Sequence, residues 1–87
     1  MDQISDAIRA FILTEFLPGE RPEDLTGDTP LITGGILDSL ATIKLVSFLE
    51  EQYGVTFQAY ETDVDHFNTV SDITSLVLSK LGPGRAR

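Results

Sequence analysis

The chain of 87 residues contains no cysteine. Neither disulfides nor thiolate metal sites can therefore stabilise it, and the absence leaves its redox compartment open. Its stability must come from a hydrophobic core, for which 41% hydrophobic residues is an ordinary supply. A chain of this length is expected to form a single small domain.

Basic residues are scarce, with six Lys and Arg against fourteen Asp and Glu and a net charge of −8. A field of that sign repels nucleic acid and anionic membranes and attracts basic protein surfaces. Arg85 and Arg87 lie in the stretch 82–87, whose glycines and proline predict a disordered tail. We therefore expect the folded domain at residues 1–81 and no binding to nucleic acid.

The sequence also lacks long hydrophobic runs. No segment approaches the ~18 consecutive apolar residues that a membrane span requires. The first residues, Met1–Asp6, include no basic region and no cleavable apolar stretch. We therefore expect a cytoplasmic monomer with no membrane span.

Apolar residues recur with helical spacing in three segments, and this pattern predicts an all-α fold. Pro18-Gly19 and Gly54 provide stops for the first two helices, whereas Thr69, followed by Asp72 three residues later, fits a capping box at the start of the last. The predicted helices span about residues 3–17, 38–53 and 69–81. The apolar stripe of the second helix is expected at Leu40, Ile43, Val46, Leu49 and Tyr53, widened by Leu45 and Phe48.

The segments between these helices complete the predicted architecture. A short helix is expected over residues 61–67. Residues 55–57 are predicted to form an extended linker, because no second strand is available to pair with them. The long connection over residues 18–37 should be pinned to the core by Leu25, Leu31 and Ile32. The expected fold is a small four-helix bundle, three main helices plus one short helix, with a long first loop.

The segment Gly34–Leu40 places Ser39 where this glycine-bearing loop gives way to the second helix. The first amides of a helix lack intrahelical partners and favour negative charge, so a phosphate on Ser39 would be stabilised there. The loop gives a modifying enzyme access to the hydroxyl. We interpret Ser39 as a modified residue rather than a catalytic one. The alternative is that Ser39 or Asp38 simply caps the helix.

Two other chemical readings are disfavoured. A serine hydrolase needs a base and a strained turn, but His66 is the only histidine and no Gly-x-Ser-x-Gly motif is present. The acidic stretch Asp63–Asn68 begins like a calcium loop. It has Phe67 where an oxygen ligand is needed and Asn68 where glycine is needed, so we expect a solvated turn with Phe67 buried.

With Leu37-Asp38-Ser39-Leu40 at the start of the second helix of a short acidic chain, the sequence resembles the acyl carrier protein superfamily. The resemblance extends from the first helix to about Leu81. It implies that Ser39 accepts 4′-phosphopantetheine from coenzyme A and that Asp38 contacts the magnesium-dependent phosphopantetheinyl transferase. It also implies that the protein is not an enzyme. Such a carrier presents a thioester-bound acyl or aminoacyl group at high effective concentration.

Within the superfamily, the segments 35–40, 48–55 and 65–69 resemble stand-alone aminoacyl carriers, including the D-alanyl carriers. Fatty-acid carriers usually have acidic residues early in the second helix, where this chain has Ala41 and Lys44. The difference favours dedicated partners in a polyketide or nonribosomal peptide type of pathway, such as an adenylating ligase and an acyltransferase or synthase. The expected partner contacts are Leu40, Ile43, Lys44 and Ser47.

A different class of function also accounts for these features. A helical interaction module without a prosthetic group could bind partners through Leu40, Ile43 and the acidic surface. The two hypotheses differ in whether activity depends on the Ser39 hydroxyl.

Overall fold

The structure is a computed structural model that describes residues 3–81. Its elements are α1 (Gln3–Phe16), η1 (Pro22–Asp24), α2 (Ser39–Tyr53), η2 (Ala59–Thr62), α3 (Val64–Phe67) and α4 (Val70–Leu81), where η denotes a 3-10 helix. No strand occurs within residues 3–81, and no helix there is both long and apolar enough to cross a membrane. The predicted all-α bundle is confirmed, whereas the predicted tail at residues 82–87 lies outside the described residues.

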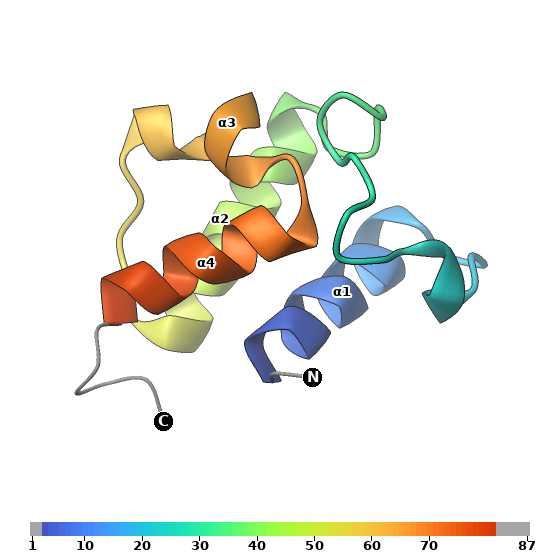
Figure 1. Ribbon diagram of the computed structural model, residues 1–87, viewed down its shortest axis with the longest axis horizontal. Coiled ribbons are helices and arrows are strands. Elements are labelled where there is room, and N and C mark those ends of the chain that lie inside the picture. Colours follow the sequence, from blue (N-terminus) through green and yellow to red (C-terminus); the bar gives the residue numbers. More distant parts are fainter. Residues whose placement is uncertain (1–2, 82–87) are drawn as a thin grey trace.

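The three long helices α1, α2 and α4 pack against one another, and the short helix α3 packs on α4. Figure 1 shows α4 crossing in front of α2, with α1 beside it. The long connection between α1 and α2 runs along one side of the bundle and leads to the start of α2 near α3 (Figure 1). The beginning of α2 therefore lies at one end of the molecule, between the long loop and α3.

The helix ends follow from local chemistry. Gly54 adopts a left-handed conformation, with φ of 67°, and its N–H donates to the carbonyl of Glu50 over 2.9 Å, which terminates α2 as predicted. At the start of α4 the Thr69 hydroxyl accepts the amide N–H of Asp72 over 3.0 Å. Thr69 therefore acts as the expected N-cap.

The single short helix predicted over residues 61–67 is wrong in one respect, because the structure divides it into η2 and α3. Asp63 is extended between them, and its carboxylate accepts the amide N–H of Asp65 over 3.1 Å. An aspartate in this conformation starts a new helix instead of continuing an old one. Phe67, at the end of α3, is fully buried as expected.

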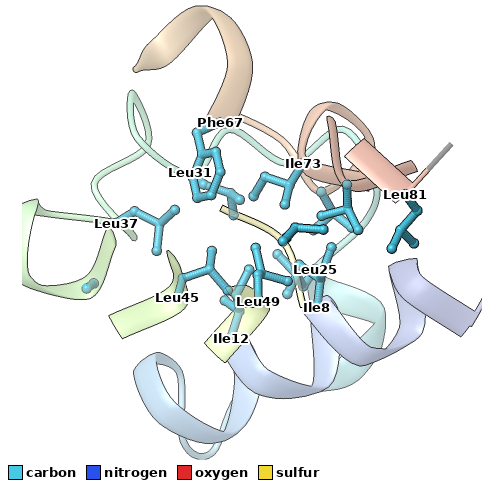
Figure 2. Packing of buried hydrophobic residues seen from close by; sticks show 14 residues of the cluster. Ile8, Ile12, Leu25, Leu31, Leu37, Leu45, Leu49, Phe67, Ile73 and Leu81 are labelled. Carbon is cyan, nitrogen blue, oxygen red and sulfur yellow. The ribbon is translucent and has the colours of Figure 1, made fainter. Parts of the chain in front are cut away.

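The core is formed by side chains from all four α-helices and from the long loop. Figure 2 shows them converging on one centre. The fully buried residues are Ile8, Ile12, Leu25, Leu31, Leu45, Leu49, Phe67, Val70, Ile73 and Val77. The predicted pinning of the loop by Leu25 and Leu31 is confirmed, and Ile32 packs on the core while partly buried. Loop and helices therefore share one hydrophobic core.

The extended segment after α2 also contributes to this packing. Val55 is buried, and the ring of Phe57 meets that of Phe67 edge-on, with 5.8 Å between ring centroids. Lys80 of α4 lies 5.2 Å from the centroid of the Phe57 ring, and its Nζ donates to Glu61 Oε1 over 2.7 Å. This ion pair links η2 to the C-terminal part of α4.

The apolar stripe predicted for α2 faces the core except at Leu40 and Ile43, whose exposure agrees with their expected role as partner contacts. The helix buries Ala41, Leu45 and Leu49, whereas Leu40 and Ile43 are 63% and 62% exposed. The helix has apolar residues on more than one side, so periodicity alone does not determine which side turns inward. Packing against α1 and α4 selects the residues at positions 41, 45 and 49, which are spaced by four.

This choice can be tested with a matched pair of leucines on the same helix. Leu45→Ala should lower the free energy of unfolding by about 2–5 kcal/mol because it leaves a cavity in the core. Leu40→Ala should change it by no more than about 0.5 kcal/mol, since Leu40 is largely in solvent. Urea unfolding followed by circular dichroism measures both, and equal losses would contradict the position assigned to α2.

Candidate functional site

Asp38 is the residue that begins α2. Its backbone is extended, with φ of −90° and ψ of −172°, and its Oδ1 accepts the amide N–H of Ala41 over 2.8 Å. Its carbonyl accepts the amide N–H of Thr42 over 2.9 Å. This is the geometry of an N-cap, in which Asp38 provides the acceptors for the amides of Ala41 and Thr42.

Ser39 is the first residue of α2 and is exposed. Within residues 3–81 its hydroxyl has no hydrogen-bond partner, and the amides of Ser39 and Leu40 likewise have none. Asp38 carries out the capping that sequence reasoning left open between the two residues. The Ser39 hydroxyl is therefore free to react, beside two amides that can donate to an anion.

The loop that precedes Ser39 is held in place by Asn68, which lies between α3 and α4. Asn68 Oδ1 accepts the amides of Ile32 and Thr33 over 2.9 and 3.0 Å, and its carbonyl accepts that of Leu31 over 2.6 Å. The carbonyl of Leu31 in turn accepts the amides of Ile36 and Leu37 over 2.8 and 2.9 Å.

The sequence alone does not indicate this role of Asn68. The sequence shows only an asparagine after a short helix, although it lies within the segment 65–69 that resembles carrier proteins. Its partners are more than thirty residues away in the chain. Only the folded structure brings these groups together.

Gly34 permits the close turn in this loop. A Cβ at this position would collide with the backbone carbonyl of Pro30, which cannot swing aside as a side chain would. The glycine is therefore required by close approach of the backbone rather than by flexibility.

Two hollows flank the start of α2. The α3-side hollow has a volume of about 540 Å³ and includes Ser39, Asp38 and Asp63 among its lining residues, with apolar or hydroxyl side chains from Ile32, Leu37, Thr42, Ile43, Thr62 and Val64. The α1-side hollow has a volume of about 300 Å³ and is lined by Glu15, Phe16, Ile36, Asp38, Leu40, Ala41 and Lys44. A group attached to Ser39 would start at the edge of the first of these.

A charged pair lies beside the α3-side hollow. The Asp63 Oδ1 atom lies 2.9 Å from His66 Nδ1, and both side chains are about half exposed. The hydrogen bond from His66 lowers the pKa of Asp63, and the same bond raises the pKa of His66 above its usual value of 6.5. Glu61 also has a lowered pKa, mainly because it accepts the backbone N–H of Gln58, with a further contribution from Lys80.

The predicted site residues are distributed around one helix start. Ser39 and Ile43 line the α3-side hollow, Leu40 and Lys44 line the α1-side hollow, and Asp38 lies at both. Ser47 is exposed but lines neither hollow. His66 is exposed, and no hydrogen bond joins it to Ser39 in the part of the chain that the structure describes.

The fold and the site together define a carrier-type protein, a small helical bundle that displays one unengaged serine hydroxyl at a helix start. Within the described residues, no group of three or more His, Cys, Asp or Glu side chains is placed to hold a metal ion.

Comparisons with known proteins agree with this class. Over 66 residues the chain is 38% identical to the probable acyl carrier protein PigG of Serratia sp. (strain ATCC 39006), an alignment that covers 76% of this chain and 75% of PigG. No protein-family model matches the chain. The chain therefore belongs to the acyl carrier protein family.

A solved structure is also similar. It is described as the crystal structure of an FAD-dependent dehydrogenase, and one of its chains matches with a TM-score of 0.71 and 37% identity. The match covers 78% of this chain and 94% of that one, so the two chains are of similar length.

The capping assignment predicts different outcomes for neighbouring substitutions. Asp38→Ala should lower the free energy of unfolding by about 0.5–2 kcal/mol because the amide of Ala41 loses its acceptor. Ser39→Ala should cost less than about 0.5 kcal/mol, because its hydroxyl supports no bond in the fold. Chemical denaturation measures both, with Asp38→Asn as the control that keeps a capping oxygen. A larger loss for Ser39→Ala than for Asp38→Ala would contradict the assignment.

The Asp63–His66 pair predicts a pH dependence. Because the pKa of His66 is raised, the contribution of protonated His66 to stability is fully present below pH 6.5 and is lost as pH rises through the folded-state pKa of His66. Because the pKa of Asp63 is lowered, the contribution of ionised Asp63 to stability is present above pH 3.8 and is lost as pH falls through the folded-state pKa of Asp63. In an NMR titration, Asp63→Asn should lower the pKa of His66, and an unchanged value would refute the pairing.

Proposed function

We propose that Ser39 carries 4′-phosphopantetheine, attached through a phosphodiester. The observation that carries this proposal is the free, exposed Ser39 hydroxyl at the start of α2. Attachment joins the serine Oγ to the phosphorus of the pantetheine side of coenzyme A, and adenosine bisphosphate leaves. The unpaired amides of Ser39 and Leu40 are placed to donate to the phosphodiester oxygens. When bound, the group supplies a terminal thiol that holds cargo as a thioester, which a chain without cysteine otherwise lacks.

Asp38 has a second role in this proposal. One carboxylate oxygen, Oδ1, accepts the N–H of Ala41, and the side chain remains exposed. The other oxygen is available to contact the magnesium-dependent phosphopantetheinyl transferase while it holds Ser39. Capping and transferase contact then use different oxygens of the same carboxylate.

We propose that the cargo is an aminoacyl or specialised acyl group and that the chain performs no catalysis itself. Resemblance of segments 35–40, 48–55 and 65–69 to stand-alone aminoacyl carriers supports an aminoacyl cargo. An adenylating ligase would load the thiol, and an acyltransferase or synthase in a polyketide or nonribosomal peptide type of pathway would take the cargo. Leu40, Ile43, Lys44 and Ser47 are the proposed contacts with these enzymes, in the cytoplasm.

We further propose that an FAD-dependent dehydrogenase acts on the carried group. The support is the 37% identical chain in the structure described as that enzyme, because that chain has about the length of this one. A carrier-sized chain in such a structure fits a protein that delivers substrate to the dehydrogenase. Oxidation of a group while it is tethered would then be one step between loading and release.

The modification is tested by intact mass spectrometry. The chain is incubated with coenzyme A, magnesium and a broad-specificity phosphopantetheinyl transferase, and we expect the mass to increase by one phosphopantetheinyl group. Ser39→Ala should show no increase, whereas Ser47→Ala, which removes another exposed serine of α2, should be modified like the unaltered chain.

The outcome separates the two classes of function. No gain of mass in a chain shown to be folded by circular dichroism would contradict the carrier proposal. The exposed Leu40 and Ile43 would then be better explained by an interaction module without a prosthetic group.

A further inference from the structure

Asn68 joins α3 to α4 and provides hydrogen-bond acceptors for three consecutive amides of the long loop. Its side-chain Oδ1 accepts the amides of Ile32 and Thr33 over 2.9 and 3.0 Å, and its carbonyl accepts the amide of Leu31 over 2.6 Å. Asn68 is also the residue at which α3 ends, so these bonds tie the loop to that short helix. Within residues 3–81, no other side chain accepts a backbone amide of the turn at residues 31–37.

A chain of hydrogen bonds connects Asn68 to the neighbourhood of Ser39. The carbonyl of Leu31 accepts the amide of Leu37 over 2.9 Å, and Leu37 lies just two residues before Ser39 in the chain. The side chain of Ile32 lines the α3-side hollow together with Ser39, so the held part of the turn is close to the serine in space as well. The location of the Ser39 hydroxyl relative to α3 therefore depends on the bonds that Asn68 accepts.

Loss of these bonds should loosen the turn without unfolding the domain. Leu31 and Leu37 are buried in the core, and their apolar packing does not require the asparagine side chain. A hydrogen bond from the amide of Ser71 to the carbonyl of Gly27, over 3.0 Å, also ties the loop to α4. That bond reaches the loop before the turn at residues 31–37, so it cannot replace the side chain of Asn68 as the polar support of the turn.

We propose that Asn68 is a positioning residue for the attachment of phosphopantetheine to Ser39, an inference that rests on the proposed function. In that step the bond from Ser39 Oγ to phosphorus forms, the bond from phosphorus to adenosine bisphosphate breaks, and a base of the transferase takes the hydroxyl proton. Asn68 touches none of these atoms. It keeps the turn before Ser39 ordered, so the transferase does not have to order that turn when it binds.

This role predicts a specific kinetic effect. If the turn adopts the ordered arrangement only part of the time, the apparent affinity of the transferase falls by that fraction, whereas chemistry in the bound complex is unchanged. Asn68→Ala should therefore raise the KM of the transferase for this chain by about 5-fold or more and change kcat by less than about 2-fold. Asn68→Asp keeps an acceptor oxygen at the same position and should restore KM to within about 2-fold of the unaltered chain.

The matched control is Thr69→Ala at the next position. It removes the hydroxyl that caps α4 through the amide of Asp72, so it destabilises the same region without removing an acceptor from the loop. Its KM should stay within about 2-fold of the unaltered chain. Hydrogen exchange measured by NMR should show faster exchange of the Ile32 and Thr33 amides in Asn68→Ala and not in Thr69→Ala.

The positioning role is overturned by an unchanged KM in Asn68→Ala, by an equal rise of KM in Thr69→Ala, or by a loss confined to kcat. If Asn68→Ala does not fold, Asn68→Gln replaces it, because the longer side chain moves the amide oxygen away from the loop, and the same rise of KM is expected. Intact mass of the unaltered chain tests the proposed function separately. An unaltered chain that is never modified contradicts both proposals, whereas normal modification with an unchanged KM in the variants contradicts the positioning role alone.

Discussion

The hydrogen bond from the Ala41 amide to the Asp38 carboxylate is the interaction on which the functional site depends. A helix start must satisfy amides that have no intrahelical partner, and a serine at this point would ordinarily be used for that purpose. Because Asp38 supplies the acceptor at 2.8 Å, the hydroxyl of Ser39 remains uncommitted. Asp38 therefore provides the helix cap and Ser39 provides the reactive hydroxyl. A substitution at Ser39 can remove the reactivity without disrupting the start of the helix.

The position of this helix start is set by contacts that come from distant parts of the chain. Asn68 holds the loop through the amides of Leu31, Ile32 and Thr33, while Leu25 and Leu31 anchor the loop in the core. The long connection is therefore an ordered part of the fold rather than a flexible linker. Ser39 therefore lies at a helix start whose backbone position is fixed by the hydrogen bonds of Asn68 and by the loop leucines that are buried in the core.

Much of the fold could be predicted because the signals are local. Helical periodicity, the Gly54 stop and the Thr69 cap act within a few residues, and all three correspond to features of the structure. The burial of Ala41 in the first turn of α2 could not be predicted, because the helix is apolar on more than one side and only its neighbours decide which side is buried. The role of Asn68 was also missed, since its partners lie far away in sequence. The start of α2 was predicted to within a residue, but whether Asp38 or Ser39 formed the cap required the structure.

Membership of the acyl carrier protein family and the free hydroxyl of Ser39 lead to one central claim, that this serine is the attachment point of the prosthetic group. Fragmentation of the modified chain by tandem mass spectrometry tests that claim most directly, because it locates the added group on a residue. The account predicts the phosphopantetheinyl group on Ser39 and on no other serine or threonine. A group found on Ser47, or on any other residue, would contradict it.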